Sequence, residues 1–119
     1  MSHIIRAAAA LFLLTGAASA QSALVEVSDR AIVAPFNQTA DTVDDWDVYG
    51  VDGTKIGEVE EVLGTDANTA TALAVDFEGN GGFADRDVIV PLDQFSFTDN
   101  RLVLNSSGAD VGNMPAYDD

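Results

Sequence analysis

The sequence lacks cysteine altogether and contains a single histidine, His3, among its 119 residues. Without cysteine the chain has no disulfides, no cysteine for a lipid anchor and no thiolate nucleophile. His3 lies in the first twenty residues, which we predict to be removed, so we expect a mature chain without imidazole. A Ser-His-Asp triad, a zinc site with thiolate or imidazole ligands and a His-ligated haem are thereby excluded.

Cationic residues are also scarce. The chain has five Lys and Arg residues against twenty Asp and Glu. Removing residues 1–20 takes away Arg6 and no acid, which leaves four cations against twenty acids and a formal charge of −16. So acidic a surface repels nucleic acid and anionic lipid, because binding to phosphate relies on clusters of Lys and Arg. We expect no nucleic-acid partner, and we favour solubility or adaptation to a salty medium over dedicated cation binding as the reason for the charge.

No apolar run is long enough to span a bilayer, which takes about 20 residues. Residues 1–20 instead combine Arg6, an apolar run over 7–14, a break at Gly16 and the small residues Ala18-Ser19-Ala20. This pattern is typical of a secretory signal peptide cut after Ala20. We predict a periplasmic protein without stable membrane insertion after cleavage; extracellular release and a retained N-terminal anchor are the alternatives.

Carboxylates are what remains for chemistry. Paired Asp and Glu residues serve glycoside hydrolases, and clusters of oxygen ligands bind hard cations such as Ca²⁺. Acids are so abundant in this chain that a pair by itself carries no information. The densest group precedes and enters a turn, and we keep it as a surface cation site to be considered: Asp44, Asp45, Asp47 and Asp52.

An EF-hand calcium loop does not fit this acidic stretch. Such a loop needs oxygen ligands at positions 1, 3, 5 and 12 and glycine at position 6. A loop that starts at Asp45 has Tyr49 at position 5 and Ile56 at position 12. A loop that starts at Asp47 has Val51 at position 5. We therefore assign no catalytic residue, no cofactor-binding residue and no metal ligand, and we expect no cofactor.

Two further patterns have a structural and a functional interpretation. The glycine-rich "GNGGF" at 79–83 lacks the Gly-Lys-Ser/Thr ending of a phosphate-binding loop, so we interpret it as a connection between strands. The aromatic residues Trp46, Tyr49 and Phe83 form either an exposed patch for sugar or protein contact or part of the core. Core or barrel-end packing is the favoured interpretation.

Short runs of alternating apolar residues begin near Asp44 and are separated by turn residues. The stretch "KIGEVEEVLGT" has near-helical spacing, which a bulged strand explains equally well because an extra residue shifts the inward face. We predict an all-β fold, a small antiparallel β-barrel of five to six short strands. We expect the following side chains in its core: Val48, Ile56, Val59, Val62, Leu73, Val75, Phe77, Val88, Val90, Leu92, Leu102 and Leu104.

Several of these features follow one another in a recognisable order over residues 44–119. A turn leads into "G-x-x-IG-x-V", followed by an alternating strand, a glycine-rich loop, a "V-x-VP" strand, a last strand and a Pro-aromatic ending. The residues concerned are Gly53, Ile56, Gly57 and Val59; Leu73, Val75 and Phe77; Gly81, Gly82 and Phe83; Val88, Val90, Pro91 and Leu92; Leu102 and Leu104; and Pro115 and Tyr117. This order resembles the PRC-barrel family.

The resemblance implies a small barrel that acts as a binding or assembly module. The family is similar to the cytoplasmic part of the photosynthetic reaction-centre H subunit and to the C-terminal domain of a ribosome maturation factor, and it has no shared catalytic residues. We predict a signal peptide at 1–20, a partly ordered extension at 21–43 and the barrel at 44–119. As a function we predict a stand-alone, exported, non-catalytic module that binds an unidentified protein partner or forms a homo-oligomer. An acidic, calcium-type cation-responsive module is the alternative, and a carboxylate-based glycoside hydrolase is less favoured.

Overall fold

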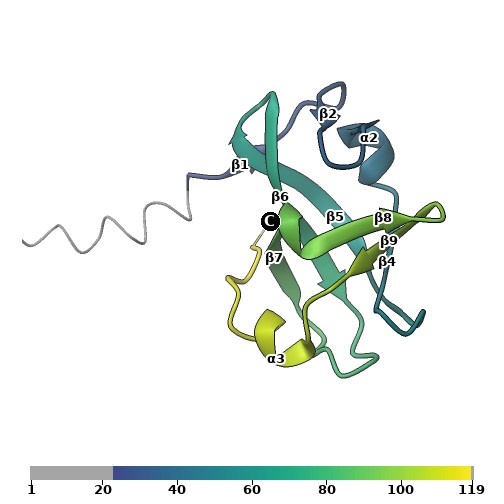
Figure 1. Cartoon of the computed structure of the whole chain (residues 1–119). Helices are drawn as coiled ribbons and strands as arrows, with labels where there is room; N and C mark the ends of the chain where they lie inside the picture. Colours follow the sequence, from purple (N-terminus) through teal and green to yellow (C-terminus); the bar gives the residue numbers. More distant parts are fainter. Residues whose placement is uncertain (1–22, 119) are drawn as a thin grey trace, which may run out of the picture.

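The computed structural model describes residues 23–118 (Figure 1). The predicted signal peptide at 1–20 lies outside the described residues. Within them, no helix has the length and the hydropathy needed to cross a membrane. The fold is mostly β, with two four-residue helices and one short 3-10 turn between the strands.

Residues 23–118 contain nine strands, and six of them follow residue 44, as predicted for the barrel. The elements run in the order β1 (Val25–Glu26), β2 (Ile32–Val33), β3 (Gln38–Thr39), α2 (Ala40–Val43), β4 (Asp47–Tyr49), β5 (Lys55–Asp66), β6 (Thr69–Phe77), β7 (Asp87–Pro91), η1 (Leu92–Gln94), β8 (Phe95–Thr98), β9 (Arg101–Leu104) and α3 (Gly108–Val111).

Seven strands form one sheet that curls into a half-barrel (Figure 1). Its order is β7-β6-β5-β4-β9-β8, with β1 attached to β5, while β2 and β3 form a separate hairpin. The predicted β-barrel of the PRC type is confirmed. One pairing differs from the antiparallel expectation, because β4 and β9 run parallel, with Val48 opposite Leu102. The long connection through β5–β8 makes this possible, since parallel neighbours cannot be joined by a tight turn.

The longest strand, β5, is bulged, which decides between the helix and the bulged strand that its apolar spacing had left open. Its pairing with β6 changes register between Val59 and Glu61 and again around Gly64. A Cβ atom on Gly57 would lie 2.6 Å from the carbonyl oxygen of Asp76, and one on Gly64 would overlap the backbone of β6. Glycine at these two positions therefore allows β6 to approach β5 closely enough to pair along its whole length.

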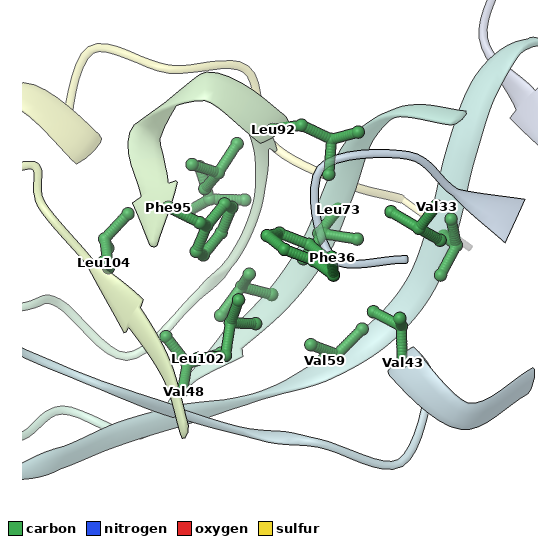
Figure 2. Packing of buried hydrophobic residues seen from close by; sticks show 14 of the residues in the cluster. Val33, Phe36, Val43, Val48, Val59, Leu73, Leu92, Phe95, Leu102 and Leu104 are labelled. Carbon is green, nitrogen blue, oxygen red and sulfur yellow. The ribbon is translucent and has the colours of Figure 1, made fainter. Parts of the chain in front are cut away.

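The N-terminal segment is packed more tightly than the partly ordered extension that we predicted. Val33 and Val43 are fully buried, and Phe36 is 5% exposed. Figure 2 shows these three side chains together with Leu73 and Val59 of the barrel. Residues 23–43 are thus part of the same core, and a boundary at residue 44 does not separate two packing units. The alternation signal was weak here because β1, β2 and β3 have only two residues each.

The C-terminal tail covers the outer edge of β7. The backbone N–H of Ile89 donates to the carbonyl of Pro115 at 2.8 Å, and the N–H of Tyr117 donates to the carbonyl of Asp87 at 2.9 Å. The Arg86 guanidinium lies within 3.5 Å of two carbonyl oxygens of the tail. Covering an edge in this way prevents it from pairing with another chain. The opposite edge of the sheet is β8, which pairs only with β9 among the described strands.

The core is the one that the alternating pattern predicted. All twelve side chains expected inside are buried, and several are shown in Figure 2. Phe95 of β8 and Val111 of α3, which were not among the expected core residues, join them. The half-barrel therefore closes around side chains from both the sheet and the short elements that cover its ends.

Replacing Val33 or Val75 with alanine should lower the free energy of unfolding by about 1–3 kcal/mol, because each variant leaves a cavity at a fully buried site. Val51→Ala is the matched control, since Val51 is 77% exposed. We expect it to change stability by less than about 0.5 kcal/mol. Urea denaturation followed by Trp46 fluorescence measures all three. If Val33→Ala is as stable as Val51→Ala, the N-terminal segment does not contribute to the cooperative core.

Candidate functional site

The candidate functional site is a groove at the point where β4 and β9 begin side by side. It has a volume of about 430 Å³ and combines acidic, aromatic and amide side chains. The parallel pairing of β4 with β9 brings the first residues of both strands to the same end of the sheet. The lining residues are Asp45, Trp46, Asp47, Tyr49, Asp99, Asn100, Arg101 and Leu102. We refer to them as the acidic groove.

The tight turn between β8 and β9 forms one rim of the acidic groove. Asp99 and Asn100 both have positive φ angles, 54° and 62°, and Thr98 pairs directly with Arg101. A two-residue turn with two positive φ angles matches the twist of an antiparallel hairpin, and Asp and Asn tolerate this conformation better than most residues. The backbone geometry thus fixes the Asp99 carboxylate at the rim.

The indole of Trp46 forms an aromatic wall of the groove. It stacks on Phe97 with ring centroids 4.5 Å apart and an angle of 5° between the planes. Phe36 packs against both rings at a tilt, with centroids 5.8 and 6.1 Å away. Trp46 is therefore half-buried and held by two neighbours, so little side-chain freedom is left to lose when a ligand binds.

Two cations already lie at the acidic groove. The Arg101 guanidinium sits over the Tyr49 ring, 4.4 Å from its centroid, in a cation–π contact. The Lys55 amine lies 3.4 Å from an Asp47 oxygen and 3.0 Å from a Glu58 oxygen. The hydrogen bond with Glu58 and the neighbouring carboxylates raise the pKa of Lys55. The groove thus has three carboxylates, at Asp45, Asp47 and Asp99, near these two cations.

The aromatic residues singled out in the sequence separate into two places. Trp46 and Tyr49 both line the acidic groove. Phe83 is buried and stacks on Phe77, with centroids 5.3 Å apart, at the rim of a second hollow of about 270 Å³. The favoured interpretation as core packing therefore describes Phe83, whereas Trp46 and Tyr49 combine packing with an exposed surface.

The four acids considered as a surface cation site do not act together. Asp45 and Asp47 line the acidic groove. Asp52 accepts a hydrogen bond from the Thr54 N–H at 3.0 Å, which stabilises the turn before β5 and lowers the pKa of Asp52. Asp44 belongs to a different environment, at the end of α2. These four acids are close together in the sequence, but the fold places them in three different settings: a turn, a groove and a helix end.

Asp44 belongs to an acidic cluster that the sequence did not reveal. Partial burial raises its pKa, and the charges of Asp45 and Asp29 raise it further. The pKa of Glu61 on β5 is also raised, first by burial and then by the charges of Asp44 and Glu26. These residues are far apart in the chain, and the pairing of β1 with β5 brings Glu26 and Glu61 into one region.

A second such cluster lies on β5, β6 and β7. Glu60, Asp76 and Asp87 each offer an oxygen, and these oxygens lie within 4.8 Å of one another. Asp76 is directly opposite Asp87, and Glu60 occupies the bulge of β5. Among the described residues this is the carboxylate group whose geometry would suit a hard cation. Finding it requires the register of three strands, which the sequence does not provide.

The fold and the groove define a small β-barrel domain. The family model of the PRC-barrel domain matches residues 37–111, so the chain belongs to the PRC-barrel family. The search of curated proteins returned no match for this chain. The matched segment begins before the predicted boundary at residue 44 and includes every residue of the acidic groove. The groove is therefore a feature of the PRC-barrel domain itself.

The pairing of Asp76 with Asp87 predicts that the protein becomes more stable as the pH falls below 7. Burial raises the pKa of Asp76 above its usual 3.8, and the charge of Asp87 and a hydrogen bond with it add to this effect. Between the unfolded and folded pKa values the folded protein binds a proton that the unfolded chain does not, so stability increases as the pH falls through the folded pKa. The charges of Glu78 and Asp85 act in the same direction.

Asp76→Asn should raise the melting temperature at pH 7 and flatten its dependence on pH between pH 7 and pH 4. Asp110→Asn, on exposed α3, is the control with the same change of charge. Thermal denaturation by circular dichroism at a series of pH values measures both. Parallel profiles for Asp76→Asn and the unmodified protein would contradict the raised pKa of Asp76.

Proposed function

We propose that this PRC-barrel domain is a non-catalytic, exported module that binds a protein partner through the acidic groove. The observation that carries the proposal is the groove itself, in which a rigid indole and three carboxylates from two segments of the chain line one open space. The export part of the proposal is supported by the sequence of residues 1–20, with its cation, apolar run and small-residue cleavage site.

The chemical character of the groove is that of a contact surface. Aromatic side chains are enriched at the centres of protein interfaces, where they bury a large area at a small cost in side-chain entropy. Trp46 meets this condition because Phe97 and Phe36 already restrict it. The acidic residues around it supply a polar rim that selects partners by charge.

A hydrolytic function is less well supported. Residues 21–119 contain neither histidine nor cysteine, so only carboxylates could act as acid and base. A glycosidase needs two carboxylates that face each other across a cleft. Asp76 and Asp87 line neither of the two hollows described above. In the acidic groove Asp47 pairs with Lys55, while Asp45 and Asp99 are exposed, so the groove lacks the buried carboxyl group that serves as general acid.

A cation-responsive function rests on carboxylates alone, so it has less support than protein binding. Calorimetry with calcium separates the two functions. Heat and a rise in melting temperature beyond those given by monovalent salt at equal ionic strength would favour the cation-responsive function. Loss of that response in Asp87→Asn would locate it at the cluster of Glu60, Asp76 and Asp87.

The net charge favours a different protein over a second copy as the partner. Two copies of a chain with a formal charge of −16 repel each other, and a contact between their acidic grooves would bring like charges together. Self-association therefore requires a surface other than the groove. Light scattering at low and high salt measures whether the mass of the particle exceeds that of one chain.

Site-directed photo-cross-linking tests the proposed function. Because the chain contains no cysteine, a single introduced cysteine can be labelled at one chosen site. A Thr98→Cys variant carries a maleimide-linked photo-cross-linker at the exposed residue next to Asp99 and keeps all three groove carboxylates, and a Thr65→Cys variant carries the same reagent at an exposed site that does not line the groove, as the control. We expect covalent adducts with periplasmic protein from Thr98→Cys and few or none from Thr65→Cys. Equal adduct yields from the two sites, or none from the groove, would overturn the proposal.

A further inference from the structure

We propose that the acidic groove receives a Lys or Arg side chain from a basic segment of the partner protein. This inference rests on the proposed function and specifies the chemical class of the partner. Asp47 already pairs with Lys55, so the acids that the groove offers to an incoming cation are Asp45, from the connection before β4, and Asp99, from the β8–β9 turn. Charges converging from two sides of a groove attract a cation more strongly than the same charges spread over a flat surface.

The groove already holds a guanidinium in the way that a partner's side chain would be held. Arg101 lies over the Tyr49 ring, 4.4 Å from its centroid. Trp46 provides a second aromatic wall in the same groove, next to Asp45. Arg and Lys side chains bind favourably over the face of Trp and Tyr, and a nearby carboxylate adds a charge-assisted hydrogen bond. A Lys or Arg side chain of the partner therefore makes both contacts in the groove, one with an aromatic face and one with a carboxylate.

A second copy of the chain cannot supply this cation from a basic segment. Lys55 is engaged by Asp47 and Glu58, and Arg86 faces carbonyl oxygens of the C-terminal tail. Arg101 lies over the Tyr49 ring of its own groove in a cation–π contact. Arg30, the fourth cation of the described residues, directly follows Asp29. No stretch of residues 23–118 is basic, so charge complementarity points to a different protein.

Trp46 allows the binding to be measured at the groove itself, because it is the single tryptophan of the chain. The probe is a short synthetic peptide in which Lys and Arg alternate with glycine. Matched peptides with Gln or Glu in place of the cations, and free spermidine, are the comparisons. We expect the basic peptide to shift Trp46 emission, with an affinity that falls as salt is added, and the other three to shift it weakly or not at all.

The double variant Asp45→Asn, Asp99→Asn identifies the groove as the binding site. Asn tolerates the positive φ at position 99, so the turn should stay intact. The control Asp110→Asn, Asp118→Asn removes the same charge from two exposed residues that do not line the groove. We expect affinity for the basic peptide to fall about tenfold in the groove variant and to stay within about twofold in the control.

Three results would overturn the inference. One is an equal loss of affinity in both double variants, which indicates attraction to the total charge alone. Another is equal binding of spermidine, which indicates a site for small cations. The third is no response to the basic peptide. If adducts from Thr98→Cys persist in that case, the protein-binding function stands and only the basic character of the partner is wrong; if the adducts are also absent, both fail.

Discussion

The close contact between β5 and β6 is the constraint on which the rest of the structure depends. Gly57 and Gly64 lie where any side chain would collide with the backbone of β6. β5 also pairs with β4 and with β1, so its position determines both the strand that borders the groove and the attachment of the N-terminal segment. The bulges that these pairings require bend the long strand, and this bending allows a single sheet to curl around its own core.

The acidic surface follows from the apolar composition of the core. Because the inward positions of the strands are taken by apolar side chains, the carboxylates are displaced to the outer face and to the turns, where water screens most of them. In two places the pairing of distant strands leaves acids too close for all of them to ionise freely. Asp44 and Glu61 form part of one, and Asp76 with Asp87 forms the other. The domain tolerates this repulsion because its stability comes from the buried apolar cluster.

The groove is also a product of the pairing between strands that are distant in sequence. Parallel alignment of β4 with β9 brings the Arg101 guanidinium of β9 over the Tyr49 ring of β4, and the β8–β9 turn adds Asp99 to the same groove. Stacking of Trp46 on Phe97 then connects this surface with the core through Phe36. The N-terminal segment therefore supports the groove directly, through the contacts of Phe36 with Trp46 and Phe97.

The sequence by itself determined the class of fold, the family and the core. Alternation of apolar residues is a local property of each strand, so positions such as Val75 and Val90 could be assigned to the interior without knowing their neighbours. The irregular spacing in β5 fitted a helix and a bulged strand equally well, and the pairing with β6 decided for the bulged strand. Pairing between strands is not local, and only the tertiary structure decided it. Strand pairing placed the acids of residues 44–52 at a helix end, in a groove and in a turn, and it brought Glu60, Asp76 and Asp87 together from three strands. It also brought Val33, Phe36 and Val43 into the core. The sequence did not reveal this last contact, because two-residue strands have too little pattern to be recognised before they are packed.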